Sequence, residues 1–365
     1  MIVAIPVKDE ADSIGACLQA LADQEGAVAD QVVLLINNTN DATVNVVRGL
    51  EPSLSVRVEV VEHQFAPGQA DAGHARRMAM QHAAVRAGPN GVLLTTDADG
   101  RVAPDWLANN LRCLRDGADA VAGCAVIDPV DALLIPAALH EADALECAYG
   151  DLLDEITSLL DPDPWDPWPR HTEHSGASIC VTLDAYRRAG GIPAVPLGED
   201  RLFFEALRRN DARIRHARDV RVTVSGRIMG RARGGMADTI RRRLIAPDLL
   251  LDDRLEATVK CARRARLRAR LRWAYRVKQP SDALMRLLRR DLGFAPSELG
   301  RLCELPTFGE AWAKAEACSP ALRRTAVPVA QLDAETRIAR ALRDALRHRQ
   351  GDAADQSEGF GVAFA

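Results

Sequence analysis

Two aspartates stand one residue apart at the end of a short apolar run. The run GVLLTT covers residues 91–96, and Asp97 and Asp99 follow it with only Ala98 between them. One interpretation is a polar turn, in which the Asp side chains hydrogen-bond to the backbone and Gly100 takes a positive φ. The other is a cation site, because carboxylate oxygens are the hard ligands that Mg²⁺ or Mn²⁺ prefers and such ions often bridge carboxylates to a diphosphate. The two residues alone leave both interpretations open.

The elements that must position these aspartates alternate between strands and helices. Apolar and β-branched runs predict strands, which cover residues 2–7, 31–38, 55–63 and 91–96. Helices are predicted between them, over residues 11–24, 42–50 and 72–88. Strands that alternate with helices of this length favour parallel pairing with right-handed crossovers. The first part of the chain is therefore predicted to be a doubly wound α/β structure with a mostly parallel sheet.

The polar residues that follow these strands should gather at one edge of the sheet. Open α/β folds bind their ligands at the carboxyl ends of the strands, and residues 6–10, 37–41 and 97–99 all stand there. The amides at 37–41 suit a nucleobase edge, and capping of the next helix is the alternative. A second Asp-x-Asp pair at 161–163 lies in a segment rich in Pro and Trp with no strand before it. Position therefore favours the pair at 97–99 as the cation site.

Composition sets the broad class. At 365 residues the chain is long for one core, which predicts a main domain and a second lobe. A hydrophobic content of 47%, a charged content of 27% and a net charge of −4 fit a soluble globular protein and give no sign of nucleic acid as a partner. No apolar run reaches the roughly 18 residues that a membrane span needs, and the start MIVAIPV has no features of a signal peptide. The 8 scattered Cys suggest buried thiols in a reducing compartment, so we expect a cytoplasmic protein.

A series of motifs in a fixed order resembles a known family. The motifs are VAIPVKDEADSIGACLQAL, LLINNTNDAT, AGHARRMAMQHAA, TTDADGRVAPDWL, HSGASICVTLDAYRRAGGIP and GEDRLFFEAL. Each is loose on its own, but their order and their positions at strand ends resemble a family 2 glycosyltransferase of the GT-A fold. The resemblance covers roughly residues 1–235, the ordinary size of such a domain. It implies a GT-A domain over 1–243, with a nucleotide-sugar half over about 1–100 and an acceptor half over about 101–243.

The resemblance also implies which residues bind the nucleotide sugar. In the family, the first loop holds the nucleotide, and the residues at the matching positions here are Pro6, Val7 and Glu10. The segment after the second strand contacts the base, and Asn38 replaces the usual Asp there. Arg76 matches a diphosphate or base contact, whereas Arg77 departs from the family's Ala-Arg-Asn motif.

The metal and the general base follow from the same resemblance. Asp97 and Asp99 match the Asp-x-Asp metal motif, so we expect Mg²⁺ or Mn²⁺ as the cofactor and Asp97 also as a donor contact. Asp200 matches the catalytic base of inverting members, and Glu199 beside it is expected to bind the acceptor or position the helix. The alternative for both is that they merely favour the start of a helix through its dipole.

Further residues are expected on the acceptor side and over the phosphates. His174, Ser175 and Gly176 precede a strand-like run, and Trp165 lies in a Pro-rich loop where stacking on a sugar and pinning of the loop are equally good interpretations. His171 is expected to be a solvated loop residue. The basic stretch SGRIMGRARGG follows another strand-like run and is expected to contact phosphate through two of its arginines, Arg227 and Arg231.

The composition changes at about residue 244. Apolar residues at helical spacing predict a helical lobe over 244–349, and 350–365 is predicted to be a disordered tail. The arginines of CARRARLRARLRWAYRVK spread around the helix instead of forming one face, which favours a solvated helix or a homodimer contact over a membrane anchor. A peripheral position at the inner membrane face is the alternative location.

The predicted function is metal-dependent transfer of a sugar from a nucleotide-diphosphate sugar to the hydroxyl of a small-molecule, glycan or lipid-linked acceptor, with inversion. A retaining GT-A transferase or a sugar nucleotidyltransferase is the alternative among enzymes, although PVKDEADSIG lacks the Gly-rich phosphate loop of the latter. Two other classes stay open. One is a non-catalytic protein that binds nucleotide sugars or anions, and the other is a basic-helix protein that docks on nucleic acid or anionic lipid, for which binding would depend steeply on salt.

Overall fold

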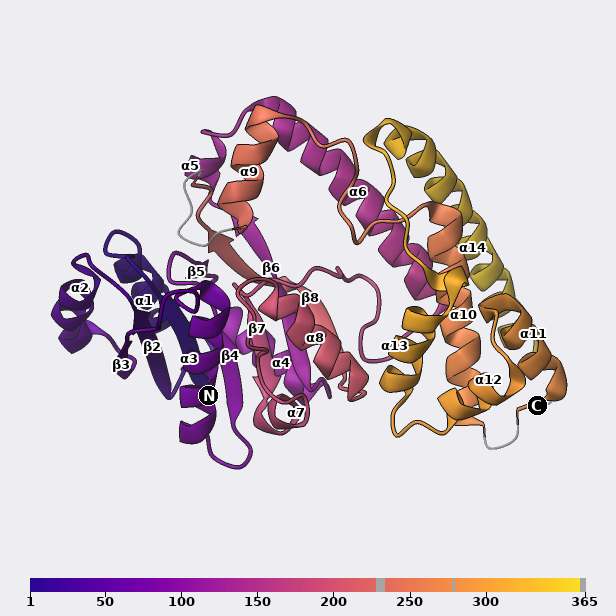
Figure 1. Ribbon diagram of the computed structural model, residues 1–365, viewed down its shortest axis with the longest axis horizontal. Helices are drawn as coiled ribbons and strands as arrows, with labels where there is room; N and C mark the ends of the chain where they lie inside the picture. Colours follow the sequence, from indigo (N-terminus) through magenta and orange to yellow (C-terminus); the bar gives the residue numbers. More distant parts are fainter. Residues whose placement is uncertain (228–233, 278–279, 362–365) are drawn as a thin grey trace. The chain divides into compact units, whose positions relative to one another are not determined.

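The structure is a computed structural model that describes residues 1–227, 234–277 and 280–361, with side chains up to 350 (Figure 1). The chain divides into two compact units that alternate along the sequence. The first comprises Met1–Pro136 and His171–Ala246, and the second comprises Ala137–Arg170 and Pro247–Ala365. The boundary predicted at 244 lies close to the end of the first unit. Residues 137–170, in contrast, group with the second unit, although the sequence suggested one continuous domain over 1–243.

A mixed sheet forms the centre of the first unit. Within the residues described, its eight strands are ordered β3-β2-β1-β4-β7-β6-β8-β5. The bounds are β1 (Ile2–Val7), β2 (Gln31–Asn37), β3 (Val58–His63), β4 (Val92–Thr95), β5 (Arg101–Val102), β6 (Ala120–Ile127), β7 (Ile179–Thr182) and β8 (Ile214–Val224). Strands β1 to β4 are parallel, β6 is parallel to β8, and β7 and β5 run antiparallel to their neighbours. The predicted α/β class with a mostly parallel sheet is confirmed.

The helices of the first unit follow the predicted alternation. Their bounds are α1 (Ile14–Ala22), α2 (Thr43–Leu50), α3 (Ala72–Arg86), α4 (Trp106–Arg115), α5 (Pro129–Ala132), α7 (Leu183–Arg188), α8 (Glu199–Arg209) and α9 (Met236–Ile245). The predicted strand over 55–63 begins only at Val58, because its ladder with β2 starts there. The turn after β1 is longer than predicted, and α1 begins at Ile14 instead of residue 11.

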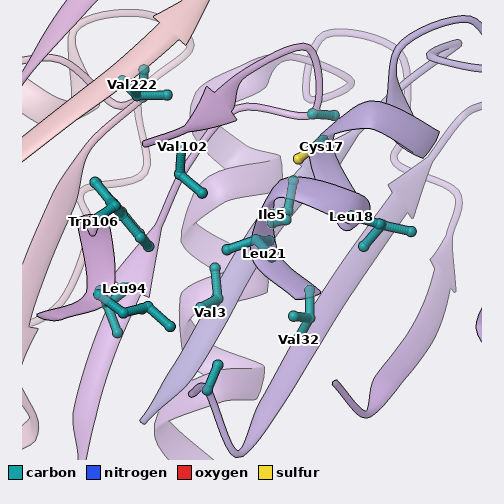
Figure 2. Close-up of a cluster of buried hydrophobic side chains, with 14 of the residues drawn as sticks. Val3, Ile5, Cys17, Leu18, Leu21, Val32, Leu94, Val102, Trp106 and Val222 are labelled. Atoms are coloured by element: carbon teal, nitrogen blue, oxygen red, sulfur yellow. The ribbon is translucent and has the colours of Figure 1, made fainter. Parts of the chain in front are cut away.

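Both faces of the sheet are covered by helices. On one face, α1 and α4 cover the sheet, and their side chains Leu18, Leu21 and Trp106 are buried there (Figure 2). On the other face, helices α3, α7 and α8 supply apolar side chains such as Met80 and Phe204. A strand buried on both faces is apolar along its whole length, which explains the run VVLLI in β2. In β2 the polar side chains are therefore confined to the two strand ends, Gln31 and Asn37, and the predicted site lies beyond the second of them.

The second unit is helical. It contains α6 (Ala137–Leu160), α10 (Thr258–Arg276), α11 (Asp282–Leu292), α12 (Pro296–Cys303), α13 (Phe308–Cys318) and α14 (Leu332–Gly361). One core joins α6, α10 and α14, and a second joins α10 to α11, α12 and α13. Helix α14 includes most of the 350–365 segment, for which the sequence suggested disorder. Among the helices described, none combines the length and the hydropathy that crossing a bilayer requires.

Asp161, in the second Asp-x-Asp pair, is an internal ion-pair residue of this unit. Its side chain is fully buried, and Arg268 of α10 binds it at 2.6 Å. Arg272, one turn further along α10, binds its other oxygen. Burial without such partners would be costly for a carboxylate, so this aspartate is explained by packing. The sequence favours the pair at 97–99 over the pair at 161–163 as the cation site, and the ion pairs of Asp161 agree with that choice.

Candidate functional site

The loops after β1 and β2 hold each other in place. The Glu10 N–H donates to Thr43 Oγ1 at 2.9 Å, and the Asn40 N–H donates to Asp9 Oδ1 at 2.8 Å. Asp9 adopts a positive φ of 53°, a conformation that Asp tolerates better than most residues. Glu10 is consequently turned inward and buried. Of the other predicted nucleotide contacts here, Val7 places its side chain in the apolar core, so only its backbone reaches the edge.

Asn38, at the end of β2, holds the segment after β3 in place through two hydrogen bonds. Its amide group donates from Nδ2 to the Phe65 carbonyl at 3.0 Å and accepts at Oδ1 from the Phe65 N–H at 3.0 Å. Both functional groups of the side chain are therefore engaged by one backbone unit. This gives Asn38 a structural task at the position where the sequence suggested a base contact.

Two carboxylates, Glu10 and Asp99, contact Arg227. The guanidinium donates to Glu10 at 2.8 and 3.1 Å and lies 3.0 Å from Asp99 Oδ2. Burial and the neighbouring carboxylate of Asp97 raise the pKa of Asp99 to about 6, although Arg227 opposes this change. Glu10 and Asp99 share Arg227, so this end of the sheet carries more negative charge than that arginine balances. Arg231, the other predicted phosphate contact, lies outside the described residues.

Arg76 of α3 connects these carboxylates to the start of α8. Its guanidinium is 4% exposed, and its Nη2 donates to Asp97 Oδ1 at 2.5 Å while its Nε donates to Glu199 Oε1 at 2.9 Å. Its Nη1 donates to Thr95 Oγ1 at 3.0 Å and to the Gly176 carbonyl at 2.7 Å. Burial alone would lower the pKa of Arg76, but the two carboxylates outweigh burial and raise it, so the group is charged.

Asp200 lies beside Glu199 in the first turn of α8. Its Oδ2 accepts from the Gly176 N–H at 2.9 Å, and its Oδ1 accepts from the Arg201 N–H at 2.7 Å. The residue before the helix is Gly198, which has a positive φ of 75° and no capping side chain. The N-cap position therefore belongs to Gly198, and Glu199 and Asp200 lie in the first turn of the helix. Each has a specific partner in the site.

The predicted acceptor-side residues separate into two groups. His174 stacks on Phe204 of α8 with ring centroids 4.4 Å apart, and its Nε2 lies 3.1 Å from His216 Nε2. Burial, followed by the charge of Arg208, lowers the pKa of His174 well below its usual value, so the ring is neutral at pH 7. Ser175 Oγ accepts from the backbone N–H of residue 177 at 3.2 Å, inside the same loop. Trp165 belongs to the second unit, where it is 42% exposed.

The prediction that His171 is solvated is wrong. The side chain is buried, and its Nε2 lies 3.1 Å from the Ala122 carbonyl on β6, with Nδ1 accepting from the Glu173 N–H at 3.2 Å. Strand β6 has an irregularity in its pairing with β8 between Gly123 and Cys124. The residue therefore serves the packing of the loop against the sheet.

A comparison with protein families identifies the region that carries the first part of this site, including Asp97 and Asp99. Residues 2–159 match the family model described as Glycosyl transferase family 2. This region is a family 2 glycosyltransferase domain. The match includes β1 to β4, α3 and both aspartates of the Asp-x-Asp motif, and it ends within α6. Asp200 and Arg227 lie beyond the matched residues.

Several solved structures of glycosyltransferases are similar to this chain. A mannosyltransferase from Pyrobaculum calidifontis in complex with GDP-Man and Mn²⁺ is 19% identical, with 95% of this chain and 81% of that chain covered and a TM-score of 0.43. S. aureus TarS in complex with UDP-GlcNAc is 16% identical, with 96% and 91% covered and a TM-score of 0.43. Glucosyl-3-phosphoglycerate synthase from Mycobacterium tuberculosis is 14% identical, with 67% and 77% covered and a TM-score of 0.38. No curated protein matches the chain.

The carboxylates of this glycosyltransferase domain fit a divalent cation that is bound together with a substrate. Among the residues that the structure describes, no three His, Cys, Asp or Glu side chains form a complete cage for a metal ion. Mg²⁺ does not need such a cage, because it is usually held by one or two carboxylates, several waters and substrate phosphates. Asp99 offers a carboxylate oxygen of the required hardness, and the excess negative charge around it favours a cation.

A cavity of about 440 Å³ opens beside Asp99 in the first unit. It lies between the start of α1 and the ends of β6 and β8, and its polar lining includes Asp12, Arg101, Asp128, Asp131 and Ser225. Sequence reasoning missed Asp128 and Asp131, which follow β6, because this strand was not identified. The apolar run AVAGCAV, followed by Asp at 128, was the signal that could have revealed them.

Proposed function

We propose that the protein transfers a sugar from a nucleoside-diphosphate sugar to an acceptor hydroxyl, with inversion and with Mg²⁺ or Mn²⁺ held by Asp97 and Asp99. One observation carries the proposal. Arg76 binds Asp97 after β4 and Glu199 at the start of α8, so the donor-side carboxylates and Asp200 belong to one site. The match to a glycosyltransferase family supports sugar transfer as the reaction.

The donor side has to stabilise a diphosphate as it leaves. A divalent cation supplies Lewis-acid stabilisation of the negative charge that grows on the phosphate oxygens. Arg227 now pairs with Glu10 and Asp99. A guanidinium binds phosphate and carboxylate oxygens with the same paired geometry, so this arginine can exchange its carboxylate partners for the donor's phosphates.

Asp200 is proposed as the general base. The two backbone N–H groups of Gly176 and Arg201 hold its carboxylate in one orientation. In an inverting displacement, the acceptor hydroxyl attacks the anomeric carbon on the face opposite the diphosphate and loses its proton as the bond forms. A carboxylate held on the acceptor side can take that proton, while Glu199 keeps the helix start in place through Arg76.

The test is a panel of nucleotide sugars with Mn²⁺ and a set of hydroxyl acceptors, with the anomeric configuration of the product read by NMR. Asp200→Asn should lower kcat by about 10²–10⁴-fold and leave donor binding intact. Glu205→Gln is the matched control, because this residue lies on the same helix and pairs only at the surface with Arg209. Retention of configuration, or near-normal kcat in Asp200→Asn, would refute the assignment of the base.

The remaining parts of the proposal concern the acceptor, the assembly and the location. We propose a small-molecule, glycan or lipid-linked acceptor approached by the loop that carries His174, Ser175 and Gly176. The helical second unit is the proposed homodimer contact, which light scattering of the purified protein tests directly. The proposed location is the cytoplasm or the inner membrane face, and fractionation of cells that produce the protein distinguishes the two.

A further inference from the structure

Arg76 has almost no hydrogen-bonding capacity left for a ligand. A guanidinium carries five N–H groups, and the structure directs four of them to Glu199, Thr95, Gly176 and Asp97. The side chain is 4% exposed. A residue that binds a nucleotide directly needs donors that face the ligand. Four of the five N–H groups of Arg76 instead face protein acceptors.

Gly176 joins Arg76 to Asp200. Arg76 binds the Gly176 carbonyl at 2.7 Å, and Asp200 accepts from the Gly176 N–H at 2.9 Å. A Cβ atom at this position would lie only 2.5–2.8 Å from the guanidinium atoms of Arg76, which shows how closely the backbone rests on them. Any shift of the guanidinium therefore moves the peptide that orients the Asp200 carboxylate.

We propose that Arg76 is a positioning residue that couples Asp97 on the donor side to Asp200 on the acceptor side, and that it does not bind the nucleotide. The inference rests on the proposed function, in which Asp200 is the general base. It assigns Arg76 a different task from the diphosphate or base contact that the sequence suggested. The coupling runs through Glu199 and Gly176, which Arg76 contacts directly.

The decisive experiment is a double-mutant cycle with Arg76→Lys and Asp200→Asn. Lysine keeps the positive charge but cannot bind all four acceptors at once, so kcat should fall about 100-fold, the loss that a small misplacement of a reacting group causes. In the Asp200→Asn background, Arg76→Lys should cause little further loss, because residues that act as a unit are not additive. If the fold losses in kcat of the two single variants multiply in the double variant, the proposal is overturned.

Nucleotide binding provides the second readout. The dissociation constants of UDP and GDP, each measured with EDTA so that no cation at Asp97 contributes, should be the same for the wild type and for Arg76→Lys. Arg77→Lys is the matched control, because Arg77 follows on the same helix and donates to the Ile192 carbonyl at 2.7 Å, away from the carboxylates. A tenfold weaker affinity for whichever nucleotide the wild type binds, in Arg76→Lys alone, would make Arg76 a donor contact and overturn the inference.

Hydrogen exchange distinguishes failure of this inference from failure of the proposed function, because it needs no turnover. Arg76→Lys and Asp200→Asn should both speed amide exchange in the segment 171–178, and Arg77→Lys should not. If amide exchange in this segment speeds up in both variants but the wild type transfers sugar from no donor, the proposed function fails and the coupling of Arg76 to Asp200 stands. If amide exchange in this segment is as slow in Arg76→Lys as in the wild type, the coupling of Arg76 to Asp200 is refuted.

Discussion

Replacement of Asp99 by Asn should make the metal-free protein more stable at neutral pH. Burial and the carboxylates of Asp97 and Glu10 raise the pKa of Asp99 from 3.8 to about 6, although Arg227 is 3.0 Å away. Because this folded-state value lies above the unfolded value, the folded protein binds the proton more tightly. Ionisation of Asp99 therefore lowers the free energy of unfolding as the pH rises through this range.

The magnitude follows from the two pKa values. One pKa unit corresponds to about 1.36 kcal/mol, so the ionised Asp99 costs as much as about 3 kcal/mol above pH 7 and almost nothing below about pH 4. Asn cannot ionise and should recover most of this amount at neutral pH. For a unit of about 200 residues, 1 kcal/mol corresponds to about 2–4 °C in Tm. The expected gain is therefore at most about 6–12 °C in the presence of EDTA, by the same relation.

The assay is thermal unfolding of wild type and Asp99→Asn with EDTA between about pH 4 and pH 8. The stability gain should grow with pH across that range, and the additional stabilisation by Mn²⁺ with a nucleoside diphosphate should disappear. Asp97→Asn is the comparison, because it removes a partner of buried Arg76 and should destabilise the protein instead. A loss of stability in Asp99→Asn at pH 8, or a gain that does not vary with pH, would refute the reasoning.

Three further substitutions test other parts of the structure. Gly176→Ala should lower the free energy of unfolding by about 1–3 kcal/mol and abolish sugar transfer, because its Cβ would press on the buried guanidinium of Arg76. Thermal unfolding measures the first effect and donor turnover the second. Arg227→Gln should weaken binding of the nucleoside diphosphate with Mn²⁺ about tenfold, as calorimetry can show, and an unchanged affinity would exclude a phosphate contact. Asp161→Asn should lower the stability of the helical unit by on the order of 3 kcal/mol, because two arginines lose their buried partner, and nucleotide affinity should not change.

The sequence predicted the elements from β1 to β4 well because two regular physical patterns determine them. Parallel strands buried on both faces are apolar along their length, and their carboxyl ends meet at one edge. Glu10, Asp99 and Arg227 could therefore be expected to come together from distant segments, and the structure brings them within contact. The rule concerns the positions of strand ends, so it does not say which side chains bind one another.

Partners of buried polar groups were beyond the reach of sequence reasoning. Arg76 and Glu199 are 123 positions apart, and no local sequence pattern predicts their ion pair. His171 follows a run rich in proline, which is typical of solvated loops, yet a backbone carbonyl on β6 gives its ring a buried partner. The pairs at 97–99 and 161–163 share one pattern and differ in surroundings, because two arginines on α10 neutralise Asp161 inside the helical unit.

The order in which the chain is synthesised matters for the second unit. Helix α6 leaves the ribosome before the second half of the sheet-containing unit, but the side chains that cover Tyr149 and Ile156 come from α10 and α14. About 100 residues separate α6 from α10, which at about 5–20 residues per second means several seconds during which this apolar face has no native partner. A nascent chain at this stage is open to association with chaperones or with other chains. A version that ends at residue 246 would stay in this state permanently, so isolation of the sheet-containing unit requires removal of α6 as well.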